Sequence, residues 1–203
     1  MARLPFGYGP RTTIYNRFNR WSRRRIWQRI LQALVEAGWI EATASIDATY
    51  VKAHRSAHGG KGGRRCRPRS FGGGQTTKIH VLTDVLGRPA VIRLTPGNVS
   101  DIRVADDLIE AAGPVRRLIA DRGYDANRLR HTLRSTGTIP VIPGRRSRRC
   151  PIRHDVRRYR DRWRIEAAFC RLKDFRRVAT RYDKLAVNFL SAVILATIIA
   201  FWV

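Results

Sequence analysis

The chain has 203 residues, and 43% of them are hydrophobic, which is enough to bury a core and excludes a wholly disordered chain. Its 41 lysine and arginine residues outnumber the 15 aspartate and glutamate residues, so the net charge is +26. A charge of this sign and size favours a polyanionic partner, most commonly nucleic acid. Three cysteines without a Cys-x-x-Cys spacing indicate a reducing compartment and no disulfide framework.

The N-terminal segment is predicted to form one or two basic helices from about Thr13 to Ala37. Apolar residues recur there at helical spacing, and seven arginines lie between Arg11 and Arg29. The residues alone leave two interpretations open, a solvated basic face and a DNA-contacting module. The first residues of the chain lack the apolar region of a secretory signal.

A strand with an acidic residue at its centre is predicted at residues 43–51, which are rich in β-branched and aromatic side chains. Aspartate is disfavoured in strands, so Asp47 is a buried salt-bridge partner, a metal ligand or the sign of a misplaced strand boundary. The stretch from His54 to Gln75 is rich in glycine and arginine and predicts a basic loop that suits a phosphate backbone. It has neither the spacing of a P-loop nor that of a zinc site.

A mixed α/β order follows this loop, with alternating units in the second half of the chain. Asp121 is expected directly after a short buried strand, where a side chain can project from the end of a sheet. The expected elements are a hairpin of two strands (76–84 and 88–94), a helix to Ala112 capped by Ser100 or Asp101, a strand (115–120), a helix to Ser135 capped by Asp125, a strand (138–142) and a second basic loop (145–153).

A helix is predicted from about His154 to Arg176, since the residues from Tyr159 to Lys173 include neither glycine nor proline. An apolar stripe on it suits packing against a core. Beside the stripe, four polar residues fall within an arc of roughly 60°: Tyr159, Arg162, Glu166 and Lys173. The pattern fits an ordinary amphipathic helix with a solvated face, and it also fits a functional face.

Residues 185–203 carry no charge and are long enough to cross a membrane. Three polar residues interrupt them, namely Asn188, Ser191 and Thr197. We therefore predict a buried C-terminal helix and no membrane partner.

Three acidic residues stand out by position: Asp47, Asp121 and Glu166 lie on two predicted strands and one helix. Such a trio can converge at one edge of a sheet, and its carboxylate oxygens suit Mg²⁺ or Mn²⁺. Two such ions promote phosphoryl transfer. Ion pairing with the many arginines is the competing interpretation.

The spacing of Tyr159, Arg162, Glu166 and Lys173 resembles the Tyr-Arg-Glu-Lys signature of a large group of bacterial insertion-sequence transposases, the superfamily usually numbered four and five. The resemblance extends from about Gly7 to the end of the chain. It includes five further stretches: residues 45–54, 77–80, 94–98, 119–125 and 177–185.

The resemblance implies an α/β fold with an RNase H-like mixed sheet flanked by helices. Residues 1–42 would be a short helical segment, part of a DNA-binding region, and residues 43–203 the catalytic domain with its C-terminal apolar packing helix. Asp47, Asp121 and Glu166 would be the catalytic residues and the ligands of Mg²⁺ or Mn²⁺.

The resemblance also implies nicking at the transposon ends, followed by attack of the freed 3′-hydroxyl on target DNA. Arg162 and Lys173 would contact DNA phosphates near the cleavage site, and Tyr159 would be their aromatic partner in DNA binding. Homo-oligomers acting on paired DNA ends, in the nucleoid of a bacterial cytoplasm, are expected.

Two departures from the family pattern are visible. The region before Gly7 is shorter than is usual, and Phe71 stands where an arginine is common. The first departure keeps a rival function open, that of a non-catalytic DNA-binding remnant of a truncated or frame-split transposase.

Overall fold

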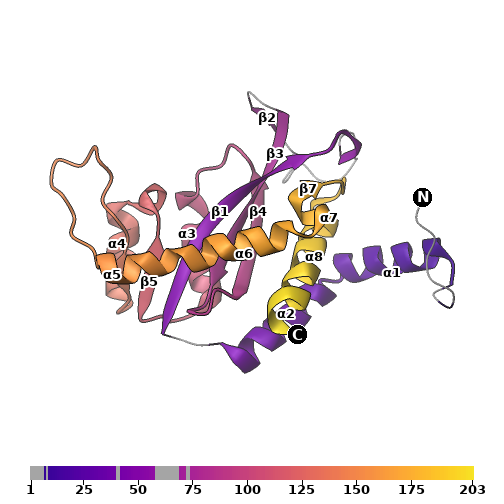
Figure 1. Ribbon diagram of the computed structural model, residues 1–203, viewed down its shortest axis with the longest axis horizontal. Helices are drawn as coiled ribbons and strands as arrows, with labels where there is room; N and C mark the ends of the chain where they lie inside the picture. Colours follow the sequence, from indigo (N-terminus) through magenta and orange to yellow (C-terminus); the bar gives the residue numbers. More distant parts are fainter. Residues whose placement is uncertain (1–6, 8, 40–41, 58–68, 72–73) are drawn as a thin grey trace.

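The architecture of the chain is known from a computed structural model, which describes residues 7, 9–39, 42–57, 69–71 and 74–203. Much of the predicted loop at residues 54–75, with His58 and Cys66, lies outside these residues. A single mixed sheet forms the centre of the fold (Figure 1). Its strands are β1 (Thr43–Ala53), β2 (Arg69–Phe71), β3 (Gly74–Thr83), β4 (Pro89–Pro96), β5 (Arg117–Ala120), β6 (Ile139–Val141) and β7 (Thr180–Arg181).

The order of the strands is that of an RNase H-like core. Strand β3 pairs antiparallel with both β4 and β1, whereas β1 pairs in parallel with β5, and β5 in parallel with β6. The short strand β2 pairs antiparallel with β3, and the short strand β7 pairs in parallel with the end of β1. The predicted fold class and the predicted hairpin are therefore confirmed, and the strand with Asp47 at its centre is the middle strand of the sheet.

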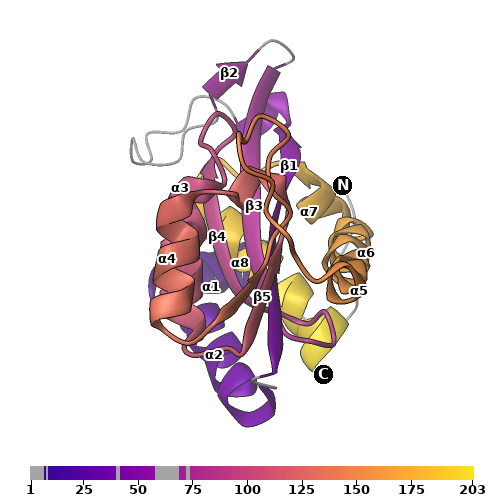
Figure 2. The ribbon, with the colours of Figure 1, turned by 90° about the vertical axis from the view of Figure 1, so that its left-hand side faces the viewer.

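Helices cover both faces of the sheet, which is seen edge-on between them in Figure 2. One face packs against α3 (Ile102–Ala112) and α4 (Asn127–Ser135), and the other packs against the C-terminal helices. The latter are α5 (Val156–Tyr159), α6 (Trp163–Lys173), α7 (Arg176–Ala179) and α8 (Ala186–Thr197), with a 3₁₀ turn at Arg160–Arg162 and a π-helical turn at Ile198–Trp202.

The alternation of side chains along β1 decides which layer each residue meets. Ala44 and Ile46 belong to the core on the α3–α4 side, whereas Val51 belongs to the core under α6 and α8. Asp47 and Thr49 have the same parity as Val51. They therefore lie on the face that α6 covers.

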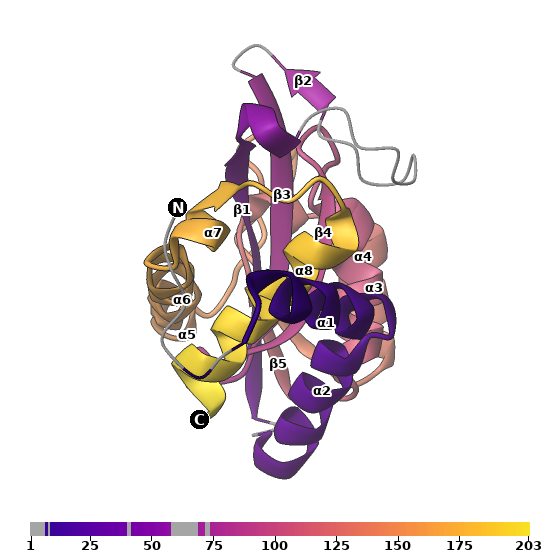
Figure 3. The same ribbon diagram turned by 90° about the vertical axis from the view of Figure 1, so that its right-hand side faces the viewer.

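The N-terminal segment, for which one or two basic helices were predicted, forms α1 (Arg11–Arg23) and α2 (Ile26–Gly38). Helix α1 carries four arginines and no acid, whereas α2 carries one arginine and one glutamate. The turn between them holds Arg25 at a φ of 55°, a left-handed conformation. Both helices pack on α8 (Figure 3), and Asn188 donates a hydrogen bond to Asn19 from there. That this segment contacts DNA stays a prediction.

The predicted long helix is confirmed, although a 3₁₀ turn divides it into α5 and α6. Its apolar stripe, comprising Ile165, Phe169 and Leu172, is buried. The predicted C-terminal helix is also buried along most of its length. In the described part of the chain, no helix combines the length and the apolar character that crossing a membrane requires.

Two predicted helix caps are wrong in their chemistry. Helix α4 begins after Ala126, and the carboxylate of Asp125 instead binds arginines. Asp101 stands at the N-cap position of α3, but its carboxylate makes no cap hydrogen bond and pairs with Lys78 at 2.9 Å. Charged donors form stronger hydrogen bonds with a carboxylate than neutral backbone N–H groups do, and this chain is rich in them.

A buried arginine fastens the C-terminal segment to the sheet. Arg181 is only 1% exposed, and its guanidinium donates hydrogen bonds to the carbonyls of Asp183 and Lys184 and to the hydroxyl of Thr77. Its guanidinium carbon also lies 5.6 Å from the ring centroid of Phe189. Since Thr77 lies on β3 and Phe189 on α8, Arg181 holds three parts of the chain together.

Replacing Arg181 should therefore destabilise the protein strongly. We expect Arg181→Ala to lower the free energy of unfolding by about 3 kcal/mol or more, because it leaves buried acceptors without donors. The matched control is Arg128→Ala, since Arg128 and its ion-pair partner Asp106 are both exposed (62% and 43%); it should cost about 1 kcal/mol or less. Urea unfolding measures both, and equal losses would contradict the role given to Arg181.

Candidate active site

Asp47 and Asp121 occupy equivalent positions on two neighbouring parallel strands. The β1–β5 ladder ends with the pair Ile46 and Ala120, and the two aspartates are the next residue on each strand. Neighbouring strands lie about 4.8 Å apart, and residues in register point to the same face. The sheet therefore brings these two carboxylates together, under α6.

Hydrogen bonds hold both carboxylates close to their own backbone. The N–H of Ala48 donates to Asp47 at 2.8 Å, and the N–H of Gly123 donates to Asp121 at 2.7 Å. The second bond closes a 3₁₀ turn (Arg122–Tyr124) directly after β5. Each carboxylate keeps an oxygen that these bonds do not use.

Glu166 reaches the same place through Arg162. The Arg162 guanidinium donates to Glu166 at 2.5 Å and lies 3.4 Å from Asp47. The Asp47 side chain is 15% exposed, whereas that of Glu166 is 58% exposed. A single cation therefore joins a largely buried carboxylate on β1 to an exposed one on α6.

The other two predicted site residues lie further along the helices. Lys173 donates a 2.6 Å hydrogen bond to Thr49, two residues beyond Asp47 on the same face of β1. Tyr159 packs edge-on against the ring of His154, with centroids 5.3 Å apart. Among the described residues, no hydrogen bond or ion pair joins Tyr159 to the three carboxylates.

The environment of Asp47 favours its protonated form. Burial raises the pKa of Asp47 to about 6, and the nearby carboxylates of Asp121 and Asp101 add to this effect. The hydrogen bond from Ala48 and the charge of Arg162 act in the opposite direction. Asp47 thus sits in a site that resists negative charge unless a further cation is present.

The donor set of this site suits a hard divalent cation, because carboxylate oxygens are what Mg²⁺ and Mn²⁺ prefer. In the ranges that the structure describes, no three His, Cys, Asp or Glu side chains are grouped closely enough to hold an ion. Arg162 lies between Asp47 and Glu166, and Glu166 is exposed enough to change its rotamer. The ligand types therefore suit a divalent metal ion. Binding one requires that the ion pairs of Arg162 with Asp47 and Glu166 break first.

Two residues near the carboxylates were not among the predicted site residues. Tyr124 is fully buried, and its hydroxyl has no hydrogen-bond partner among the described residues. Burial raises its pKa, as do the charges of Asp101, Asp47 and Asp121. Tyr124 stands in one of the family-like stretches, residues 119–125, and that resemblance was the available signal. Asp101 is the second residue, and it lies three positions beyond the stretch 94–98.

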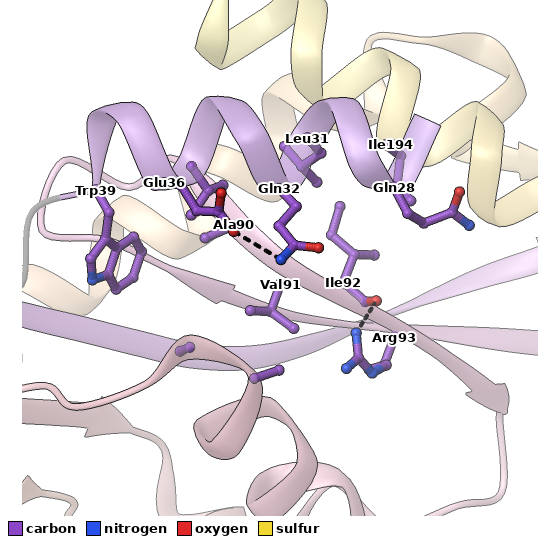
Figure 4. Close-up of a pocket in the computed structure, with 13 residues that line it drawn as sticks. Gln28, Leu31, Gln32, Glu36, Trp39, Ala90, Val91, Ile92, Arg93 and Ile194 are labelled. Atoms are coloured by element: carbon purple, nitrogen blue, oxygen red, sulfur yellow. Dashed lines mark hydrogen bonds between the residues drawn. The ribbon is translucent and has the colours of Figure 1, made fainter. Parts of the chain in front are cut away.

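A cavity beside α2 is separate from this site. It has a volume of about 680 Å³ and lies between α2, β4 and the end of α3 (Figure 4). Polar side chains line part of it, and Gln32 donates a 2.9 Å hydrogen bond to Glu36 there. None of the six predicted site residues contributes to its wall.

Comparison with known protein families gives a match over most of the length of the chain. Residues 40–201 match the family model described as the transposase DDE domain. The chain belongs to the DDE transposase family. The match spans the sheet, both core layers and all three acidic residues discussed above. This is a family of enzymes that cleave DNA and transfer strands.

Relatives of this DDE transposase chain come from bacterial insertion sequences. It is 39% identical over 125 residues to a protein assigned as the transposase for insertion sequence element IS6501 of Brucella ovis. The aligned region covers 60% of this chain and 94% of that protein. It is 36% identical over 121 residues to the corresponding protein for element IS402 of Burkholderia cepacia. That match covers 54% of this chain and about half (55%) of the IS402 protein.

Solved structures similar to this chain include transposase–DNA complexes. The piggyBac transposase synaptic complex with hairpin DNA has a TM-score of 0.43 and 15% identity, over 62% of this chain and 28% of that chain. A pre-cleavage Mos1 transpososome has a TM-score of 0.35 and 13% identity, over 89% of this chain and 61% of that chain.

The raised pKa of Asp47 has a measurable effect on stability. A carboxyl group whose pKa rises on folding binds its proton more tightly in the folded state, so its ionisation destabilises the fold. This cost is absent below pH 3.8, grows as the pH rises towards 6, and is constant above that. We expect Asp47→Asn to stabilise the metal-free protein at pH 7.5 by up to about 3 kcal/mol, from the interval between 3.8 and about 6.

Urea unfolding between pH 4 and pH 8, without divalent ions, measures this gain. It should shrink steadily below pH 6. Glu110→Gln, at an exposed position on α3, is the control and should leave stability nearly unchanged at every pH. A gain for Asp47→Asn that does not vary with pH would contradict the role of the proton.

Proposed function

We propose that this chain catalyses metal-dependent cleavage of DNA at the ends of an insertion sequence and transfer of the cut strand into target DNA. Asp47, Asp121 and Glu166 are the proposed catalytic residues. The observation that carries the proposal is the geometry at the end of the β1–β5 ladder. The carboxylates of Asp47 and Asp121 stand there in register, and that of Glu166 is joined to Asp47 through Arg162.

In this proposal, Asp47, Asp121 and Glu166 hold Mg²⁺ or Mn²⁺. When bound, the metal activates the attacking oxygen and stabilises the leaving one in phosphoryl transfer. Pairing of β1 with β5 fixes the backbone of both aspartates, so these two ligands are already in place before the metal binds. Glu166 joins them from α6, whose buried stripe fixes the helix on the sheet.

The proposed DNA contacts lie along the same helix. A DNA phosphate offers the Arg162 guanidinium a bidentate anionic partner. Contact with it would withdraw Arg162 from Asp47 and Glu166 and leave both carboxylates free. Lys173 would bind a second phosphate, and Tyr159 would add an aromatic contact near the start of the helix.

The proposed partners are the transposon ends and target DNA. The net charge of +26 supports a polyanionic partner, as does family membership. We further propose a homo-oligomer on paired ends, acting at the nucleoid in a bacterial cytoplasm. A chain that binds end DNA but never cuts it would instead fit the DNA-binding remnant.

The triad is tested by removing one carboxylate at a time. Asp47→Ala, Asp121→Ala and Glu166→Ala should each abolish Mg²⁺-dependent cleavage of a duplex carrying the terminal repeat, because each removes an oxygen ligand. Binding of the same duplex should survive. Gel assays of nicked product and of complex formation measure the two effects.

A matched control is Glu110→Ala, which removes an exposed carboxylate from α3 on the other face of the sheet. It should cut like the parent chain. Normal cleavage by the Glu166 variant would overturn the assignment of the third ligand. Binding without cleavage by the parent chain itself would favour the remnant.

The phosphate contacts are tested by salt dependence. Arg162→Ala or Lys173→Ala should weaken DNA binding and reduce the slope of log affinity against log salt by about 0.9, the value for one phosphate contact in duplex DNA. Fluorescence anisotropy at several salt concentrations measures the slope. Arg134→Ala, on α4 across the sheet, should leave it unchanged, and an equal reduction there would contradict a specific role for α6.

A further inference from the structure

The second basic loop, between β6 and α5, is fastened to the protein by one buried carboxylate. Asp125 has a fully buried side chain that accepts hydrogen bonds from the guanidinium groups of Arg130 and Arg148 and from the N–H of Arg145. Burial opposes ionisation of Asp125, but these three donors outweigh it and hold its pKa below the ordinary value. The carboxylate therefore stays charged and joins α4 to both ends of the loop's first turn.

The same loop also binds the turn that carries Asp121. The Arg145 guanidinium donates to the carbonyl of Arg122 at 3.2 Å and to the carbonyl of Gly123 at 2.9 Å. These carbonyls lie one and two residues after Asp121. A loop without regular secondary structure is thus held at a fixed place beside the proposed catalytic centre.

The side of the loop that faces solvent carries unpaired positive charge. Arg146, Arg149 and Arg153 are exposed, and none of them forms an ion pair with any residue that the structure describes. Holding three like charges on one short loop is unfavourable without an anionic partner. The bonds of Arg145 and Arg148 hold the first turn of the loop in place, so Arg146 and the neighbouring Arg149 stay close to each other.

The position of this loop separates it from the contacts proposed for Lys173. In Figure 1 the loop adjoins α5 at one end of the α5–α6 helix, and α7, which follows Lys173, lies at the other end. The span from Val156 to Lys173 is about 26 Å at 1.5 Å per residue. Basic groups therefore lie at both ends of the helix that carries Glu166.

We propose that Arg146, Arg149 and Arg153 bind the phosphate backbone of the target duplex, independently of its sequence. This inference rests on the proposed function, because strand transfer needs two duplexes to meet at one catalytic centre. With the transposon end along Arg162 and Lys173, the loop side is left for the target. Phosphate contacts of this kind position DNA without reading its bases.

The first test is the triple variant R146Q/R149Q/R153Q, which keeps the Asp125 anchor intact. With a labelled duplex of random sequence, the slope of log affinity against log salt should fall by about 2.7, that is, 0.9 for each of three lost contacts. The control R103Q/R116Q/R134Q removes the same charge from exposed positions on α3, α4 and the loop before β5. It should leave the slope within about half a unit of the parent value.

An unchanged slope for the loop variant would overturn the proposal. A loss confined to a duplex with the terminal repeat would assign the loop to the transposon end and overturn it as well. The measurement needs no metal and no cleavage. A failure of the metal-site proposal would therefore show in the cleavage assay while this result stands.

Cys150 provides a second measurement within the loop. Its thiol is exposed and free, next to Arg149. Its alkylation by iodoacetamide, followed by mass spectrometry, should slow at least fivefold when the random-sequence duplex saturates the protein. In the triple variant, saturated at higher DNA concentration, it should stay as fast as in free protein. Full reactivity of Cys150 in the parent complex would contradict the proposed contact.

Discussion

The chain has 41 basic side chains and only 15 acidic ones. Several of its buried carboxylates therefore bind arginines and connect distant parts of the fold. Asp84 illustrates this. Its fully buried carboxylate accepts bonds from the side chain and N–H of Arg88 and from the N–H of Leu86, closing the β3–β4 turn. Arg88 in turn donates to the carbonyl of Gly38 and lies 4.4 Å from the ring centroid of Trp202. Through Arg88, one acid thus ties the hairpin to the end of α2 and to the C-terminal turn.

At Asp47 the surroundings disfavour the charged form of the carboxylate. It lies in the central strand, where burial and neighbouring acids favour the neutral form, and one arginine partly compensates. A buried carboxylate with a single weak ion pair adds nothing to the fold that an apolar residue would not. A bound divalent cation would offset both the burial and the neighbouring negative charges. The environment of Asp47 therefore supports the proposed metal site.

The sequence carried the local parts of this structure and missed the long-range ones. Alternation along β1 and the stripe of Ile165, Phe169 and Leu172 depend on neighbouring residues, so strand, helix and facing sides were predictable. The partners of Asp125 come from residues up to 23 positions away, and local rules gave a helix cap instead. The placement of Asp121 beside Asp47 follows from the strand order, and the family resemblance implied it, but composition and spacing could not.

The packing of α1 and α2 on α8 has a consequence for how the chain is made. Helix α2 ends at Gly38, whereas its partner begins at Ala186, so all the strands of the sheet are synthesised between them. Contacts of such large sequence separation form late, because a long loop has to close first. The first helices therefore leave the ribosome well before their apolar sides have anything to cover. Until α8 emerges, the apolar sides of α1 and α2 and the sheet face that α8 covers lack their native partner.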